Sequence, residues 1–177
     1  MIMHKCPLYI LLSLFLSNTY AFGEVTTMKK MDISFELELN VSVEEAWSLW
    51  TDSKKLEKWL TSEAIVNPEL GGAYELFWDP TNHNDNSTIG CKITAFIPNR
   101  LLAFEWRGPV PFADLMNVDP FPTWASVSFE PRSIDQTVFH FRHSGWGEGE
   151  RWKAARDWQI KAWNGAFGEL KNLINKN

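Results

Sequence analysis

Alternation of apolar and polar residues is the clearest pattern in the chain. Over 33–39, apolar residues occupy every second position, and two of the three positions between them are acidic. A period of two with one apolar face is typical of an antiparallel strand whose other face meets water. Six further strands are predicted over 64–67, 73–78, 88–97, 100–107, 124–130 and 137–144.

Helical spacing is found in two parts of the sequence. Ser42 and Glu45 form a capping box, in which each side chain binds a backbone N–H of the other residue at the start of a helix. A second short helix is predicted to follow at once, capped by Asp52 or Ser53. Apolar residues then recur every three or four positions over 152–174, which predicts one long final helix.

This order of elements predicts an α+β fold in which an antiparallel sheet curves around the terminal helix. The connection over 108–123 contains four prolines, which exclude a central strand. It is also rich in apolar residues, and a long apolar loop usually covers something. Two interpretations follow for 109–123: a lid over a pocket, or a surface for a protein partner.

The first 21 residues have the pattern of a secretory signal peptide. Lys5 gives the start a positive charge, an apolar run follows over 7–16, and small residues stand at Thr19 and Ala21. The run is too short to span a bilayer comfortably, and no other long apolar run follows. We therefore expect no stable membrane anchor.

These signals divide the chain into three parts. We expect a signal peptide over 1–21, a linker over 22–31 and a single domain over 32–175. Such a protein would be secreted or periplasmic. Translation from Met28 or Met31 would instead leave it in the cytoplasm.

Composition narrows the class of protein. The 177 residues are 45% hydrophobic and 22% charged, which is typical of one globular domain. Acidic residues outnumber basic ones by 22 to 17, which argues against a nucleic-acid partner. The chain has ten tryptophans, which are too large and polar-tipped to be ordinary core residues. They indicate either an oversized apolar interior or a cavity lined with aromatic surface.

Several short segments carry a family likeness. They are 43–47 (VEEAW), 71–74 (GGAY), 100–106 (RLLAFEW), 137–146 (TVFHFRHSGW) and 158–170. In their order and spacing they resemble the activator-of-Hsp90-ATPase-like (AHSA1-like) branch of the START/Bet v 1 (SRPBCC) superfamily. The resemblance implies a helix-grip fold, in which a seven-stranded antiparallel sheet grips the C-terminal helix around a cavity. It also implies a binder of apolar ligands, although some relatives are cyclases or hydrolases.

We expect a small hydrophobic or aromatic ligand in that cavity. The last helix presents an apolar stripe whose first turns carry Arg156 and Gln159, while Trp158 falls on the other side. With His143, these two polar residues would orient a polar group of the ligand. The expected aromatic walls are Tyr74, Trp78, Phe104, Trp106, Phe139, Phe141 and Trp163.

His143 lies on the apolar face of its strand, so a core residue is the favoured interpretation. The alternative is the general acid or base of a cyclase- or hydrolase-like enzyme. A third possibility is an interaction module, co-chaperone-like, that engages a protein through Trp158 and the 109–123 loop.

No metal or cofactor site is predicted. His140 and His143 point to opposite faces of one strand, so they cannot bind the same metal ion. His83 lies in a polar loop that is better explained as solvated turns. Cys91 alternates with apolar residues and is expected to be a buried structural thiol.

Overall fold

The computed structural model describes residues 31–176. The expected signal peptide over 1–21 lies outside these residues, as does all but the last residue of the expected linker over 22–31. The strands are β1 (Ile33–Leu39), β2 (Glu63–Val66), β3 (Tyr74–Phe77), β4 (Ile93–Ile97), β5 (Leu101–Trp106), β6 (Thr123–Ser133) and β7 (Gln136–Ser144). The helices are α1 (Val43–Thr51), α2 (Ser53–Leu56), the 3-10 turn η1 (Val110–Phe112), α3 (Ala113–Met116) and α4 (Glu150–Asn175).

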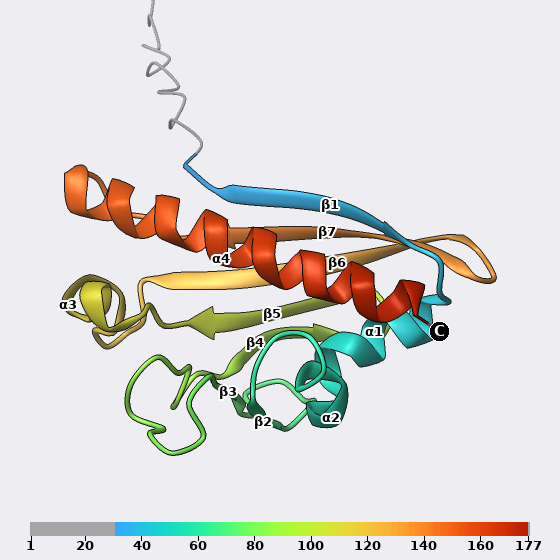
Figure 1. Cartoon of the computed structure of the whole chain (residues 1–177), viewed down its shortest axis with the longest axis horizontal. Helices are drawn as coiled ribbons and strands as arrows, with labels where there is room; N and C mark the ends of the chain where they lie inside the picture. The colour runs from blue at the N-terminus through green and yellow to red at the C-terminus, as the bar shows by residue number, and fades with distance from the viewer. Residues whose placement is uncertain (1–30, 177) are drawn as a thin grey trace, which may run out of the picture.

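The strands form two antiparallel sheets. One has five strands in the order β1-β7-β6-β5-β4, and the other pairs β2 with β3. An isolated bridge between Ala73 and Lys92 connects the two, and another pairs Phe77 of β3 with Ser87 in the following loop. The long helix α4 runs across one face of the larger sheet, with α1 and α2 near its C-terminal end (Figure 1). The α+β helix-grip fold is confirmed, with its seven strands divided between two sheets.

The division occurs where the strand expected over 88–97 begins late, at Ile93. In this segment, side chains form hydrogen bonds that backbone groups would form in a regular sheet. The Thr88 hydroxyl donates to Tyr74 O over 2.9 Å and accepts from Leu76 N over 2.8 Å. The Glu75 carboxylate likewise accepts from Gly90 N over 2.8 Å. The backbone of 88–92 is therefore fastened to β3 without being a strand.

The short helices begin where their caps predict. Ser42 Oγ accepts from Glu45 N over 3.2 Å at the start of α1. Asp52, rather than Ser53, caps α2 by accepting from Lys54 N and Lys55 N. α2 is a single turn, so Trp59, expected on this helix, lies in the turn that follows it.

An aromatic core fills the space under α1 and α2. Trp50 is fully buried and stacks on Phe141 at 5.8 Å between ring centroids. Phe139 contacts the same indole edge-on at 5.7 Å, and Phe167 reaches it from α4 at 6.2 Å. We refer to Trp50, Phe139, Phe141 and Phe167 as the core cluster.

The segment between β5 and β6 folds back on the domain. Met116 is fully buried, and it fits because Gly108 has no side chain: a Cβ there would lie 2.4 Å from the Met116 sulfur. Gly108 N donates to Asn117 Oδ1 over 2.8 Å, and Asn117 Nδ2 donates back to Gly108 O over 3.1 Å. This clamp fixes the end of β5.

Candidate functional site

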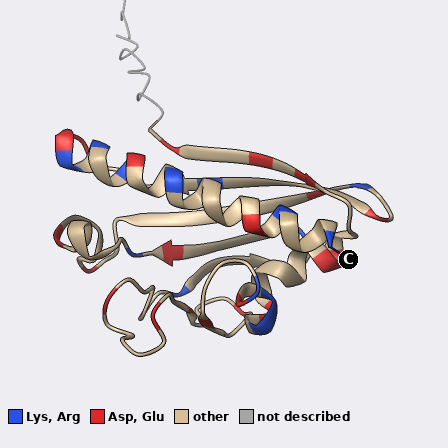
Figure 2. Ribbon diagram, viewed as in Figure 1, with Lys and Arg blue, Asp and Glu red and all other residues tan. Residues whose placement is uncertain are grey.

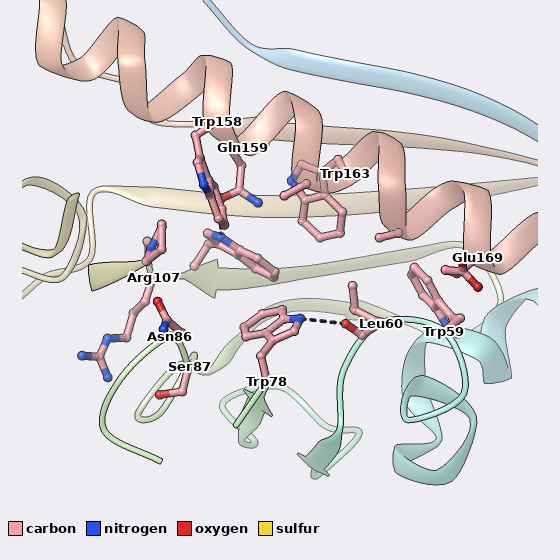
Figure 3. A pocket seen from close by; sticks show the side chains of 15 residues that line it. Trp59, Leu60, Trp78, Asn86, Ser87, Arg107, Trp158, Gln159, Trp163 and Glu169 are labelled. Atoms are coloured by element: carbon pink, nitrogen blue, oxygen red, sulfur yellow. Dashed lines mark hydrogen bonds between the residues drawn. The ribbon is translucent and has the colours of Figure 1, made fainter. Parts of the chain in front are cut away.

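A pocket of about 530 Å³ opens between α4 and the loops that follow α2, β3 and β5. Its volume is in the range of small-molecule sites. Five of its fifteen lining residues are tryptophans: Trp59, Trp78, Trp106, Trp158 and Trp163. The polar residues that line it are Asn86, Ser87, Arg107, Gln159 and Glu169 (Figure 3). We refer to it as the tryptophan pocket.

The indole rings of the pocket support one another. Trp106 is central: its ring centroid lies 4.8 Å from that of Trp163 and 5.9 Å from that of Trp78. Trp106 and Trp163 are almost completely buried, whereas 39% of Trp78 and 44% of Trp158 are exposed. The pocket therefore has a rigid floor and a mouth bordered by half-exposed indoles.

The N–H groups of four of these indoles already have acceptors. Trp78 Nε1 donates to Leu60 O over 2.8 Å, and Trp59 Nε1 donates to Leu49 O over 3.0 Å (Figure 3 shows the first). Trp106 Nε1 lies 3.4 Å from Gln159 Oε1, a long hydrogen bond to a buried amide. The fourth acceptor is a histidine, described next. These contacts leave mainly the aromatic faces for a ligand.

His143 is fully buried behind the pocket floor. Its Nδ1 accepts from Trp163 Nε1 over 3.2 Å, so the neutral ring carries its proton on Nε2. Nε2 has no partner among the described residues. Burial lowers the pKa of His143 to about 3, which makes it a weak base at neutral pH. It does not line the pocket, and its surroundings are those of the core residue favoured from sequence.

The structure brings four of the ten expected site residues to the pocket lining. They are Trp78, Trp106, Gln159 and Trp163. Tyr74, Phe104, Phe139 and Phe141 are instead fully buried in packed surroundings and do not line this pocket.

Tyr74 shows why such residues are core. Its ring stacks on Phe104 at 3.9 Å, and its hydroxyl donates to Trp50 O over 3.0 Å. Complete burial raises the pKa of this phenol. Its one polar group is therefore occupied inside the fold.

Arg156 lies away from the tryptophan pocket. Its guanidinium donates to the backbone oxygens of Met31 and Asp32, at the start of β1. It borders a separate recess with residues 32–35 and Ile160. Arg156 and Gln159 were expected to orient a ligand together, but the structure separates them. Gln159 faces the tryptophan pocket, and Arg156 holds the start of β1.

Sequence reasoning missed several lining residues. Trp158, placed on the far side of α4, reaches the pocket mouth because the mouth lies beside the core stripe rather than under it. A usable signal was present: Trp158, Ala162, Ala166 and Glu169 recur at helical spacing, and the two alanines leave room. Asn86, Ser87 and Arg107 carry no comparable signal, because they line the pocket from loops.

The other candidate chemical groups are occupied within the fold. His83 Nε2 lies 3.0 Å from Glu63 Oε2, and its ring stacks on Phe77 at 3.9 Å. Residues 31–176 contain no group of three His, Cys, Asp or Glu side chains that could hold a metal ion. Cys91 is buried, as predicted, and burial raises the pKa of its thiol. His140 faces away from His143, beside Glu36 and Glu130.

No helix within 31–176 is both long and apolar enough to cross a membrane.

Comparisons with known proteins show which solved structures share this fold. Among the similar solved structures are the following three, each matched over most of both chains. A protein from Mesorhizobium loti has 18% identity and a TM-score of 0.63, covering 82% of this chain and 98% of that one. The Aha1 dimer from Colwellia psychrerythraea has 21% identity and a TM-score of 0.62, covering 81% and 95%. An HSP90 activator from Plasmodium falciparum has 16% identity and a TM-score of 0.63, covering 82% and 96%.

These identities are low, so the structural likeness by itself shows only a shared fold. No curated protein matches the sequence. The sequence model of one family, described as Activator of Hsp90 ATPase homolog 1-like protein, matches residues 40–175. That match spans most of the chain and confirms the resemblance in its motifs: the chain belongs to the Activator of Hsp90 ATPase homolog 1-like family.

Proposed function

We propose that this protein binds a small apolar or aromatic molecule in the tryptophan pocket. The observation that carries the proposal is the five-indole wall around about 530 Å³ of space. Trp78 and Trp158 leave about two-fifths of their surface open to water, which is unfavourable, and a ligand that covers these rings gains a hydrophobic contribution.

The hydrogen bonds of the wall support the same proposal. Trp59, Trp78, Trp106 and Trp163 all donate their N–H groups to acceptors within the protein. Their faces are held in place before a ligand arrives, so little side-chain entropy is lost on binding. Gln159 and Ser87 offer polar contacts that would fix the orientation of a ligand.

Filling the pocket from α4 tests this proposal. Ala162 lines the pocket and is half-buried, so Ala162→Phe places a ring inside it. We expect the affinity for the neutral fluorophore N-phenyl-1-naphthylamine to fall by about tenfold or more, as the loss of a binding volume predicts. The matched control is Ala154→Phe, an exposed position on the same helix, which should leave binding unchanged.

Two results would contradict ligand binding. One is equal affinity in Ala162→Phe and Ala154→Phe. The other has two parts. Protein that is purified natively and then denatured releases no small molecule, and its tryptophan fluorescence does not respond to apolar aromatic compounds.

A second candidate function is binding of a protein partner through the 109–123 segment. Val110 and Val118 each expose about half of their surface there, 51% and 47%. The similar Plasmodium falciparum protein is described as an HSP90 activator, and the family is described as Activator of Hsp90 ATPase homolog 1-like protein. The test is the ATPase rate of purified Hsp90 with this chain and with its Val110→Ser/Val118→Ser variant. No stimulation by the parent chain, or equal stimulation by both, would reject this surface.

We further propose export, on the signal-peptide pattern of residues 1–21. Fractionation and mass spectrometry of the mature N-terminus test it. Export predicts a chain that begins near residue 22, while a cytoplasmic chain that begins at Met28 or Met31 would reject it.

A further inference from the structure

The two charged residues that line the tryptophan pocket lie at its opposite ends. Figure 3 places Glu169 beside Trp59 at one end and Arg107 at the other. Glu169 is exposed on α4, and none of the ion pairs within residues 31–176 includes it. Its carboxylate is therefore available to a ligand.

Arg107 makes its contacts outside the pocket, although it too takes part in none of the ion pairs within residues 31–176. Its side chain runs away from the indoles in Figure 3. Arg107 Nη1 donates to Ile89 O over 3.0 Å, and the guanidinium carbon lies 5.8 Å from the centre of the Phe121 ring. The basic residues of α4 are spaced along the helix (Figure 2), but none of them lines the pocket.

The wall of the pocket also favours positive charge. An indole presents a negative face, and Trp is the best aromatic partner for a cation. Because four of the pocket indoles turn their N–H groups to acceptors within the protein, mainly faces are left for a ligand. Trp59 is only 5% exposed, but it lines the pocket beside Glu169, so an aromatic ring and a carboxylate lie together at one end.

We infer that the ligand of this pocket is an organic cation: an ammonium group seated near Trp59 and Glu169, with an apolar body along Trp106 and Trp163. This inference rests on the proposed function and names the chemical class of its ligand. An anionic ligand would instead require the Arg107 side chain to turn toward the pocket. Its Nε is buried and has no hydrogen-bond partner among the described residues, so it could donate to such a ligand.

Three small probes of matched shape separate these choices. Benzyltrimethylammonium is a cation, neopentylbenzene is its neutral carbon isostere, and benzylsulfonate is an anion. Titrations with each follow tryptophan fluorescence of the parent protein. We expect the cation to bind about 2- to 30-fold more tightly than the neutral isostere, the range of cation–π contributions, and the anion to bind weakest.

Glu169→Gln tests the carboxylate directly. It should weaken binding of the cation about threefold or more, since an exposed carboxylate contributes modestly, and leave the neutral probe unchanged. Glu150→Gln is the matched control, because Glu150 is exposed on the same helix and does not line the pocket. It should change neither affinity.

The outcomes distinguish this inference from the proposed function. If the neutral or anionic probe binds as tightly as the cation, or if Glu169→Gln has no effect on the cation, the organic-cation inference fails while ligand binding stands. If N-phenyl-1-naphthylamine binds but none of the three probes does, the organic-cation inference fails alone. If none of the four compounds binds, the proposed function fails with it.

Discussion

Two groups of aromatic residues meet the same helix and differ in what covers them. The core cluster lies under α1 and α2, and each of its four side chains is at most 4% exposed. In the tryptophan pocket, Trp78 and Trp158 are each about two-fifths exposed around open space. The two regions adjoin, because Phe141 of the core cluster lies 4.3 Å from Trp163 of the pocket.

The difference lies in the covering segments rather than in the sheet. α1 supplies Trp50, which contacts the three other members of the core cluster as well as Trp59 and Phe104, and fills its region. The pocket is bordered by Asn86, Ser87, Gly108 and Pro109, which are too small or too polar to fill it. Two aromatic-rich regions thus give a packed core under a helix and an open pocket under loops.

Truncating one tryptophan from each region should have the largest and most unequal effect. Trp50→Ala is expected to lower the free energy of unfolding by about 3–5 kcal/mol, because it leaves a cavity in the core cluster. Trp158→Ala should change it by about 0.5 kcal/mol or less, as is usual for partly exposed positions. Chemical denaturation measures both. Similar losses in the two variants would show that the pocket is packed in solution.

Acidification should destabilise the protein through His143, which lies where the two regions meet. Its pKa is about 3 in the fold and near 6.5 in the unfolded chain, so the unfolded state binds the extra proton first. Stability is complete above pH 6.5 and falls by about 1.4 kcal/mol per pH unit as the pH drops toward 3. Denaturation midpoints across this range measure the slope.

A variant of each strand histidine provides the comparison. His143→Gln removes the titrating group and should flatten the pH dependence, while its amide oxygen can still accept from Trp163. His140→Gln, on the opposite face and half-exposed, should retain the parent slope. If the two variants keep the same slope as the parent, His143 is not the group responsible.

The smallest expected effect concerns the loop that borders the pocket. Thr88→Val removes the hydroxyl that bonds Tyr74 O and Leu76 N, and leaves two buried backbone groups without it. We expect a loss of about 1–3 kcal/mol in unfolding free energy. Thr81→Val, on the exposed part of the same loop, is the control and should cost less. Equal losses would indicate that the loop is not held through Thr88.

Much of the fold could be predicted because its signals are local. The alternation over 33–39 matches β1 residue for residue, and the capping box places the start of α1. The strand expected over 88–97 is too long, because the Thr88, Glu75 and Glu105 side chains take hydrogen bonds among its first residues and interrupt the ladder. The spacing of apolar residues does not show where a side chain replaces a backbone group as a hydrogen-bond partner.

The candidate site was less predictable. Trp106, Trp163 and Gln159 could be placed toward the interior by the period of their strand or helix. Periodicity gave the same prediction for Phe139 and Phe141, which the structure places in the filled core. Whether an inward-facing aromatic residue lines a cavity depends on the segment opposite, and that segment is distant in sequence.

The sequence by itself determined the order of the elements, the inward face of each, and the excess of tryptophan. Those properties follow from side-chain spacing within a few residues, which a helix or strand imposes locally. Only the tertiary structure decided that Trp158 and Glu169 border a pocket, that Arg156 fastens β1, and that His143 is buried behind the floor. A pocket is space that packed segments leave unfilled, so it is set by contacts between distant parts of the chain.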